Sequence, residues 1–426
     1  MKYRWIILSL VFLAMGMFFS CEEEKVERTD PAKRYNESFY NLMEDMYLWY
    51  QHIPDVDPQD YDDVQALLEA IRYEEDRWSY ISSYQAFVQY YQEGAYVGYG
   101  FGYKWDETDS LRLTFVFDES PLQDAGITRS WAITKINGDE VAPSQDISEK
   151  LGADEPGVEN RFEFKGPQGQ IVDTTFAKKE LTMNTVLEDT VIDHNSSRVG
   201  YFVLKSFINK TPNELATVFD RFASENIDEL VVDLRYNGGG TLKGSRFLGE
   251  FIVNDEYENE PYVKISHNDK QTQRDTTHVF GKDSLDISLG LDRVYFITTQ
   301  ATASASEALI NGLEPYMDTY LIGGDTYGKP VGMNAYRSND YEYVFVPVTF
   351  SLENAEGVAN YYDGLPVDVS ARDGVTELFG SPQEASLHQA LYHIANGSFD
   401  QTKAGYPAIP ANRVEYRSLE DEIGAE

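Results

Sequence analysis

The first part of the chain has apolar residues at helical spacing. From Phe39 they recur at every third or fourth position, which predicts the buried face of a helix that ends before Pro54. A second stripe of the same kind runs from Val64 to Ile71 and predicts another helix. Because such stripes are typical of core faces, we interpret residues 35–93 as a small helical unit with a packing role.

The hydrophobic period then changes from helical to alternating. Apolar and polar positions alternate after residue 110, and an Asn137-Gly138 pair between two apolar runs is a strong hairpin signal. Strands are predicted at residues 111–117, 131–136, 162–164 and 171–177. This pattern predicts a small β-rich module over residues 94–183.

From Gly200 onward, short apolar runs alternate with helical stretches. The predicted strands lie at residues 201–204, 230–234, 294–299 and 320–322. The predicted helices lie around 213–223, after Thr241, and at 305–313. Such alternation favours a three-layer α/β domain with largely parallel strands, here assigned to residues 184–426. The whole chain is therefore predicted to be a multidomain α+β protein, since 426 residues exceed one ordinary core.

The charge of the chain excludes one class of partner. Its 72 acidic and 35 basic side chains give a formal net charge of -37. A surface so negative repels phosphate backbones and offers no basic stripe for counterion release. We therefore expect no nucleic acid partner, and the acidity is most simply explained by solubility.

The N-terminus has the pattern of an export signal. Two basic residues precede an apolar run from Trp5 to Phe19, which is short for a membrane span. The only cysteine, Cys21, follows this run, and the placement resembles a bacterial lipoprotein cleavage site. Residues 1–21 are then a signal peptide, Cys21 is the acylated residue and 22–34 form a tether. An ordinary signal peptide with an incidental cysteine is the alternative.

A candidate nucleophile lies at the start of a predicted helix. Residues 301–307 read Ala-Thr-Ala-Ser-Ala-Ser-Glu, after a buried strand. This context places the Ser304 hydroxyl and the amides that follow it at a positive helix terminus, which suits an oxyanion. A serine needs a base to become a nucleophile, and the six histidines are scattered without a triad-like context. A lysine could serve instead.

The candidate base is Lys329, 25 residues after Ser304 at the end of a Gly-Asp-Thr-Tyr-Gly-Lys loop. One helix and one returning strand separate the two residues, so the two loops can lie side by side. As a base, the lysine needs its pKa lowered from about 10.4 to roughly 7 or 8, which burial away from carboxylates achieves. Glu307, on the same helical face as Ser304, could orient the lysine or bind it. These two roles have opposite effects.

These motifs together resemble the active site of the carboxyl-terminal processing (tail-specific) peptidases, serine peptidase family S41, a Ser/Lys group related in fold to crotonase and ClpP. Residues 233–240 read Asp-Leu-Arg-Tyr-Asn-Gly-Gly-Gly and match the family's Asp-Leu-Arg-x-Asn-x-Gly-Gly loop. The resemblance implies that Gly239, or else Gly240, and Ala305 donate their amides to the oxyanion hole. It also implies a Ser304/Lys329 dyad with Glu307. Pro330 departs from the glycine that more often follows the lysine.

The β-rich module resembles the PDZ domains attached to bacterial proteases. The resemblance rests on Ser-Pro and Ala-Gly-Ile within residues 120–127 and on Ile-Asn-Gly-Asp at 136–139. It implies that Gly100, Phe101 and Gly102 form the loop that holds a peptide's terminal carboxylate. The alternative, a dinucleotide-binding loop, requires a helix after the glycines, and none is predicted there.

The resemblance implies an exported serine endopeptidase that hydrolyses protein or peptide substrates, with a PDZ-like module that binds polypeptide C-termini. Its expected location is the cell envelope, lipid-anchored to the bacterial outer membrane. No cofactor is implied, and no metal, because the chain has neither a His-Glu-x-x-His motif nor a cysteine cluster. Two alternatives remain: a catalytically inactive peptide-binding lipoprotein on a peptidase scaffold, and a glycan-binding surface protein suggested by the abundant aromatic residues.

Overall fold

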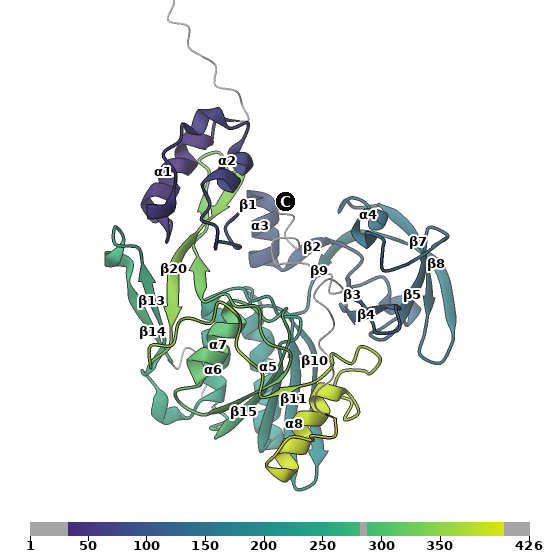
Figure 1. Cartoon of the computed structure of the whole chain (residues 1–426). Coiled ribbons are helices and arrows are strands. Elements are labelled where there is room, and N and C mark those ends of the chain that lie inside the picture. Colours follow the sequence, from purple (N-terminus) through teal and green to yellow (C-terminus); the bar gives the residue numbers. More distant parts are fainter. Residues whose placement is uncertain (1–32, 282–287, 404–426) are drawn as a thin grey trace, which may run out of the picture.

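The computed structural model describes residues 33–281 and 288–403 (Figure 1). The predicted signal peptide, Cys21 and nearly all of the predicted tether therefore lie outside the described residues. Within the described residues, no helix is long and apolar enough to cross a membrane.

The N-terminal unit contains the two predicted helices, α1 (Asn36–Met46) and α2 (Val64–Ile71). Their apolar faces share a core with strands from much later in the sequence, β19 (Tyr343–Val346) and β20 (Val348–Glu353). A short strand, β1 (Tyr80–Ser83), also pairs antiparallel with β19. This pairing was not predicted, because period and propensity carry no information on contacts across more than 250 residues.

The β-rich module is built as a sheet in the order β3-β4-β5-β7-β8 (Figure 1). Its strands are β3 (Phe101–Trp105), β4 (Leu111–Val116), β5 (Ala132–Ile136), β7 (Glu159–Lys165) and β8 (Ile171–Ala177). The predicted hairpin is confirmed: Asn137 and Gly138 have φ of 55° and 90° and join β5 to β6 (Asp139–Glu140). The short helix α4 (Ile147–Leu151) packs on this sheet, and α3 (Tyr84–Val88) precedes the module.

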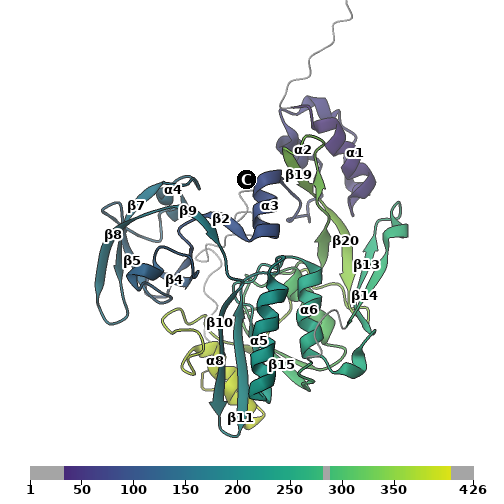
Figure 2. The ribbon, with the colours of Figure 1, turned by 180° about the vertical axis from the view of Figure 1, so that it is seen from behind.

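A two-stranded ribbon joins the β-rich module to the rest of the chain. It consists of β2 (Ala95–Gly98) and β9 (Lys179–Thr182), which pair antiparallel where the chain enters and leaves the module. Both views show the module to one side of the main body (Figures 1 and 2).

The main body is a six-stranded sheet in the order β10-β11-β12-β15-β16-β21. Its strands are β10 (Val186–His194), β11 (Ser197–Leu204), β12 (Glu229–Asp233), β15 (Arg293–Thr298), β16 (Asp318–Gly323) and β21 (Val369–Ser370). All neighbouring pairs from β11 to β21 are parallel, and only β10 pairs antiparallel. The predicted parallel arrangement is therefore confirmed for these strands.

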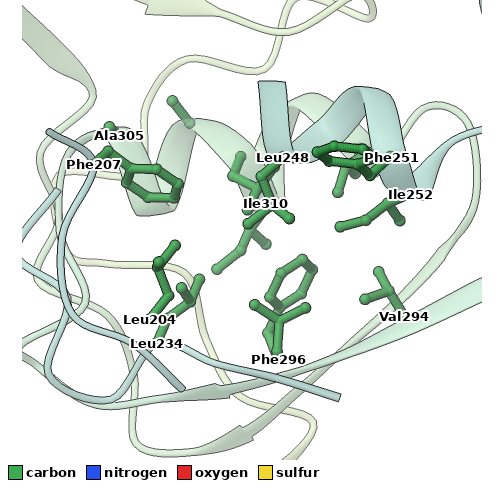
Figure 3. Close-up of a cluster of buried hydrophobic side chains, with 14 of the residues drawn as sticks. Leu204, Phe207, Leu234, Leu248, Phe251, Ile252, Val294, Phe296, Ala305 and Ile310 are labelled. Carbon is green, nitrogen blue, oxygen red and sulfur yellow. The ribbon is translucent and has the colours of Figure 1, made fainter. Parts of the chain in front are cut away.

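Helices cover both faces of this sheet, because successive residues of a strand point to opposite faces. One face packs against α5 (Thr211–Glu225), α6 (Leu242–Ile252) and α7 (Ala305–Leu313). Figure 3 shows this core, with Leu234 and Phe296 of the sheet side facing Leu248 and Ile310 of α6 and α7. The other face packs against α8 (Ala385–Asn396). Burial of each large apolar side chain contributes about 1.5–3 kcal/mol to folding.

A second, smaller sheet flanks the main body, in the order β14-β13-β20-β17. Besides β20 it contains β13 (Pro261–His267), β14 (Thr276–Val279) and β17 (Val331–Met333). The short strand β18 (Tyr336–Arg337) pairs with β19 in the sheet of the N-terminal unit. Strand β17 matters for the site, since it begins two residues after Lys329.

Candidate active site

The candidate site lies where parallel strands of the six-stranded sheet end. Since β11, β12, β15 and β16 run in the same direction, the loops after them meet at one edge of the sheet. Hydrogen bonds join these loops: the Phe207 amide donates to the Gly239 carbonyl (2.9 Å) and the Ala303 amide to the Asn237 carbonyl (3.2 Å). The glycine-rich loop after β12 therefore lies directly beside the loop that carries Ser304.

Ser304 forms a sharp turn between β15 and α7. Its φ of 57° and ψ of -115° are unusual for a residue with a side chain, and such strain persists only where the surroundings enforce it. The residue is partly exposed, whereas Ala305, the first residue of α7, is fully buried. A strand-to-helix turn of this kind presents a hydroxyl at the end of a sheet.

Gly239 allows the two loops to touch. A Cβ atom at this position would lie 2.8 Å from the Ser304 Cβ and 3.0 Å from the Ala305 nitrogen, and the backbone has φ of 109°. Any larger residue would therefore push the loops apart. The close approach that was expected from the motifs, between residues 233–240 and 301–307, is present in the structure.

Glu307 connects the Ser304 turn to the Lys329 turn. Its carboxylate accepts hydrogen bonds from the backbone amides of Ser304 (2.8 Å), Gly328 (2.7 Å) and Lys329 (2.9 Å) and from the Thr326 hydroxyl (2.6 Å). The side chain is fully buried. Burial raises the pKa of Glu307, and these four hydrogen bonds oppose part of the rise.

This geometry decides between the two roles considered for Glu307. The carboxylate accepts from the backbone amide of Lys329, and its contacts with the Ser304 segment are also to backbone. Glu307 is thus a positioning residue that fixes the two turns, not a group in contact with reacting atoms. The sequence placed it correctly on the Ser304 face of the helix but did not reveal which atoms it holds.

Lys329 ends the loop that follows β16. The loop is tied to the Ser304 segment by a hydrogen bond from the Tyr327 amide to the Thr302 carbonyl (2.9 Å). Lys329 is only 4% exposed, and its Nζ lies 3.8 Å from the Sδ of Met333. Gly328 before it has φ of 92°, and a Cβ there would lie 2.2 Å from the Tyr362 carbonyl oxygen.

The amides of Gly239 and Gly240, the two predicted oxyanion donors of the glycine-rich loop, point in different directions. The Gly239 amide donates to Oδ1 of Asn237 (2.8 Å), so the loop itself uses this donor. The Gly239 carbonyl points toward Phe207 on the β11 side, and the N–H of the same trans peptide, which belongs to Gly240, points the opposite way. That direction is the β15 side, where Ser304 lies. On this geometry the Gly240 amide, rather than the Gly239 amide, is directed to the side of Ser304.

A network of buried charged side chains surrounds the residues that begin the glycine-rich loop. The Arg235 guanidinium is fully buried and bonds Asp233, Glu384 and Asp373. Tyr236 donates its hydroxyl to Asp373 (2.7 Å). These partners come from β12, from the segment after β21 and from the start of α8. Asp373 and Glu384 were missed by sequence reasoning, because no motif marks them.

The same network reaches the β-rich module. Lys104 of β3 bonds Asp373 (2.8 Å), and Arg129 contacts both Asp373 (3.4 Å) and the Tyr236 hydroxyl (2.9 Å). Burial alone would raise the pKa of Asp373, but Lys104, Arg235 and Arg129 outweigh it and hold this pKa well below its usual range. Asp373 is therefore ionised, and its ion pairs and hydrogen bonds connect the β-rich module to the loop after β12.

The predicted peptide-binding residues lie in the β-rich module, in a different sheet from Ser304. Gly100 has φ of 78°, and its carbonyl accepts from the Phe117 amide (2.8 Å). Phe101 and Gly102 belong to β3, an edge strand that pairs only with β4 among the described strands. Because a strand and not a helix follows the glycines, the dinucleotide-loop alternative is contradicted. Within the described residues, no cluster of His, Cys, Asp and Glu could hold a metal ion.

Comparison with known families gives two matches that together include the site. Residues 198–361 match peptidase family S41, and residues 34–80 match the peptidase S41 N-terminal domain. The first match contains the loops of Gly239, Ser304 and Lys329. The second covers both helices of the N-terminal unit.

The curated relatives include carboxyl-terminal processing proteases. The chain is 25% identical over 230 residues to the carboxy-terminal processing protease CtpB of Bacillus subtilis, over 52% of this chain and 45% of that protein. It is 24% identical over 231 residues to the carboxyl-terminal-processing protease of a Picosynechococcus species, over 52% of this chain and 51% of the relative. The chain thus spans about half the length of the curated relatives it matches.

A solved structure agrees over most of the chain. A putative S41 protease from Bacteroides fragilis superposes with a TM-score of 0.73 at 25% identity, over 85% of this chain and 98% of that chain. The mixed α/β multidomain fold is therefore that of S41 proteases. We conclude that residues 198–361 form a peptidase family S41 domain, and that the chain is a homologue of the carboxyl-terminal processing serine peptidases.

Proposed function

We propose that this chain is a serine endopeptidase in which Ser304 is the nucleophile and Lys329 the general base. The observation that carries the proposal is the position of Glu307, whose one carboxylate binds the backbone on both sides of the reaction centre. A buried carboxylate with four hydrogen bonds is a costly feature, and here it fixes two turns that are 25 residues apart. Such preorganisation is what a two-residue catalytic centre requires.

The mechanism follows from the chemistry of the two side chains. The neutral Lys329 amine removes the proton from Ser304 Oγ as the oxygen attacks the substrate carbonyl carbon. The leaving amine then takes this proton from the lysine, and an acyl-enzyme remains. Water attacks the ester with Lys329 again as the base, which frees Ser304. Burial of Lys329 supports the role, since removal from water disfavours the ammonium form.

Two backbone amides stabilise the negative oxygen of the tetrahedral intermediate. Ala305 is the first residue of α7, and amides of the first helical turn have no acceptor within the helix. The Gly240 amide faces the same side of the loop as Ser304. Preorganised donors of this kind are among the strongest contributions to acyl transfer.

The β-rich module is proposed to bind the C-terminus of a polypeptide. Its edge strand β3 can accept an extended peptide as an added strand, and the turn at Gly100 leads directly into this strand. The names of the curated relatives, carboxyl-terminal processing proteases, support a substrate recognised at its C-terminus.

Export and anchoring are part of the same proposal. The N-terminal apolar run and Cys21 support a lipoprotein held at the outer membrane of the cell envelope. Mass spectrometry of the protein purified from its native membrane fraction tests this. A diacylated or triacylated N-terminal Cys21 is expected, and an unmodified chain that still begins at Met1 would contradict it.

The activity is tested with the form that lacks residues 1–21 and its Ser304→Ala variant. Casein, an unstructured protein, should be cleaved by the parent only, and a fluorophosphonate probe should label Ser304 in the parent only. Because the probe reacts with activated serines, its failure to label would favour the inactive peptide-binding alternative. Labelling without casein cleavage would instead indicate an active centre that needs a peptide on the β-rich module.

A further inference from the structure

We propose that Met333 positions the amine of Lys329. The inference rests on the proposed function, and its starting point is the contact of 3.8 Å between the Met333 Sδ and the Lys329 Nζ. Sulfur is large, so a separation of this length is compatible with a weak N–H···S hydrogen bond. Lys329 is buried, and the orientation of its amine therefore depends on the side chains that line it.

The backbone after Lys329 aims the methionine at the lysine. Met333 ends β17, and the pairing of this strand with β20 skips Thr349, which leaves the extra residue on β20. Irregularities of this kind increase the local twist of a strand pair, and they are frequent beside active sites. Gly332 allows β17 to approach β20 closely here, because a Cβ there would lie 2.0 Å from the Phe350 ring.

Two apolar clusters hold the Met333 side chain in place. It packs against the cluster of the N-terminal unit, which includes Trp78 and Val331, and against a second cluster that includes Phe115 and Val344. A thioether chain is flexible and fills irregular gaps between such surfaces. The sulfur is thus fixed where the N-terminal unit, the β-rich module and the Lys329 turn come together.

A thioether suits a lysine that must act as a base. It accepts an N–H weakly and carries no charge, so it restrains rotation of the amine without stabilising the ammonium form. A carboxylate at the same place would stabilise the ammonium, and a hydrocarbon would offer the amine no acceptor. Two charged groups beside the turn bind its backbone: Glu307 accepts from the Lys329 amide, and Arg77 donates to the Gly328 carbonyl (3.5 Å).

The test compares three substitutions in the form that lacks residues 1–21. The rate of Ser304 labelling by a fluorophosphonate is measured against pH for the parent and for Met333→Leu, Met333→Gln and Met333→Glu. Met317→Leu is the matched control. Met317 is also partly buried, but it lies just before β16, whereas the Lys329 loop follows the other end of that strand.

Each variant has its own expected result. Met333→Leu should slow labelling about tenfold with an unchanged pH midpoint, since one weak acceptor is lost but no charge is added. Met333→Gln, a neutral acceptor, should recover much of that loss. Met333→Glu should move the acidic limb of the profile upward by more than about one pH unit, because the carboxylate stabilises the ammonium. Met317→Leu should label like the parent.

The outcomes separate this inference from the proposed function. If the parent is labelled at Ser304 and Met333→Leu matches it, the positioning role is overturned while the dyad stands. Equal slowing by Leu and Gln, with the Glu midpoint unmoved, would show that Met333 only fills space, and would also overturn the role. A parent that is not labelled at Ser304 overturns the proposed function, and the positioning role with it.

Discussion

Two buried carboxylates stand near the candidate site, and they are stabilised in opposite ways. Glu307 is surrounded by backbone amides and one hydroxyl, and burial raises its pKa. The Asp373 side chain is 7% exposed and faces Lys104, Arg129 and Arg235, and these cations hold its pKa well below the usual range. The first is stabilised by dipoles and the second by charges.

The difference indicates what each carboxylate does. Glu307 joins two turns of the same domain, so its influence is confined to the geometry of Ser304 and Lys329. Asp373 joins the β-rich module to Arg235 and Tyr236, which begin the glycine-rich loop. Loss of Glu307 should therefore act mainly on catalysis, whereas loss of Asp373 should act mainly on stability and on the placement of the module.

The largest effect is expected for the dyad itself. Ser304→Ala and Lys329→Ala should each abolish casein hydrolysis, because one removes the nucleophile and the other its base. Circular dichroism and thermal unfolding of both variants should show an intact fold. Measurable hydrolysis by either variant would refute the dyad assignment.

Asp373→Ala should cost about 3–5 kcal/mol in the free energy of unfolding, since it leaves buried cations without their partner. Urea unfolding followed by tryptophan fluorescence measures this. The matched control is Asp189→Ala, which removes a partly exposed ion pair with Arg221 and should cost no more than about 1 kcal/mol. Equal losses in unfolding free energy for the two variants would show that the contacts of Asp373 contribute no more than a surface ion pair.

Glu307→Gln should lower kcat/KM about 10- to 100-fold with a smaller loss of stability, because the amide cannot accept from all four donors and the two turns shift. Casein hydrolysis and unfolding by urea, measured on the same samples, separate the two effects. Glu314→Gln, just beyond the end of α7, is the control and should behave like the parent. A stability loss without a loss of rate would mean that Glu307 has only a structural role.

The smallest effect is a difference in pH dependence. The folded-state pKa of Asp373 is lowered, so its contribution to stability is present above about pH 4 and is lost as the pH falls further. The folded-state pKa of Glu307 is raised, so its contribution is present below about pH 4.3 and is lost as the pH rises through that folded value.

Unfolding free energies measured between pH 3 and 7 test this contrast. The expected changes are on the order of 1 kcal/mol. The difference in unfolding free energy between the parent and Asp373→Asn should become smaller as the pH falls below about 4. The corresponding difference between the parent and Glu307→Gln should become larger as the pH falls. Parallel curves for the two variants would contradict the opposite pKa directions.

The sequence predicted the local elements well because local patterns cause them. The residues of α7, predicted at 305–313, are those found, and the alternating stretch at 111–117 forms β4. The Asn137-Gly138 turn and the order of parallel strands also follow from neighbouring residues. Short-range periodicity and turn chemistry are properties of a few consecutive residues, so they can be recognised in the sequence.

The site itself was predicted only in part. The motifs indicated Ser304, Lys329 and the glycine-rich loop, and the structure brings their backbones together through Glu307 and Gly239. The choice between Gly239 and Gly240 could not be made, because it depends on the direction of one peptide plane. The Asn237 side chain, which accepts from the Gly239 amide, has no sequence signal that distinguishes it from an ordinary turn residue.

The sequence by itself determined the elements, their order and the residue types available for acyl transfer, since these depend on local spacing and on side-chain chemistry. Only the tertiary structure decided which atoms meet. Asp373 lies 138 residues from Arg235 and 269 from Lys104. Contacts over such separations arise from the packing of whole sheets and helices, which no short segment encodes.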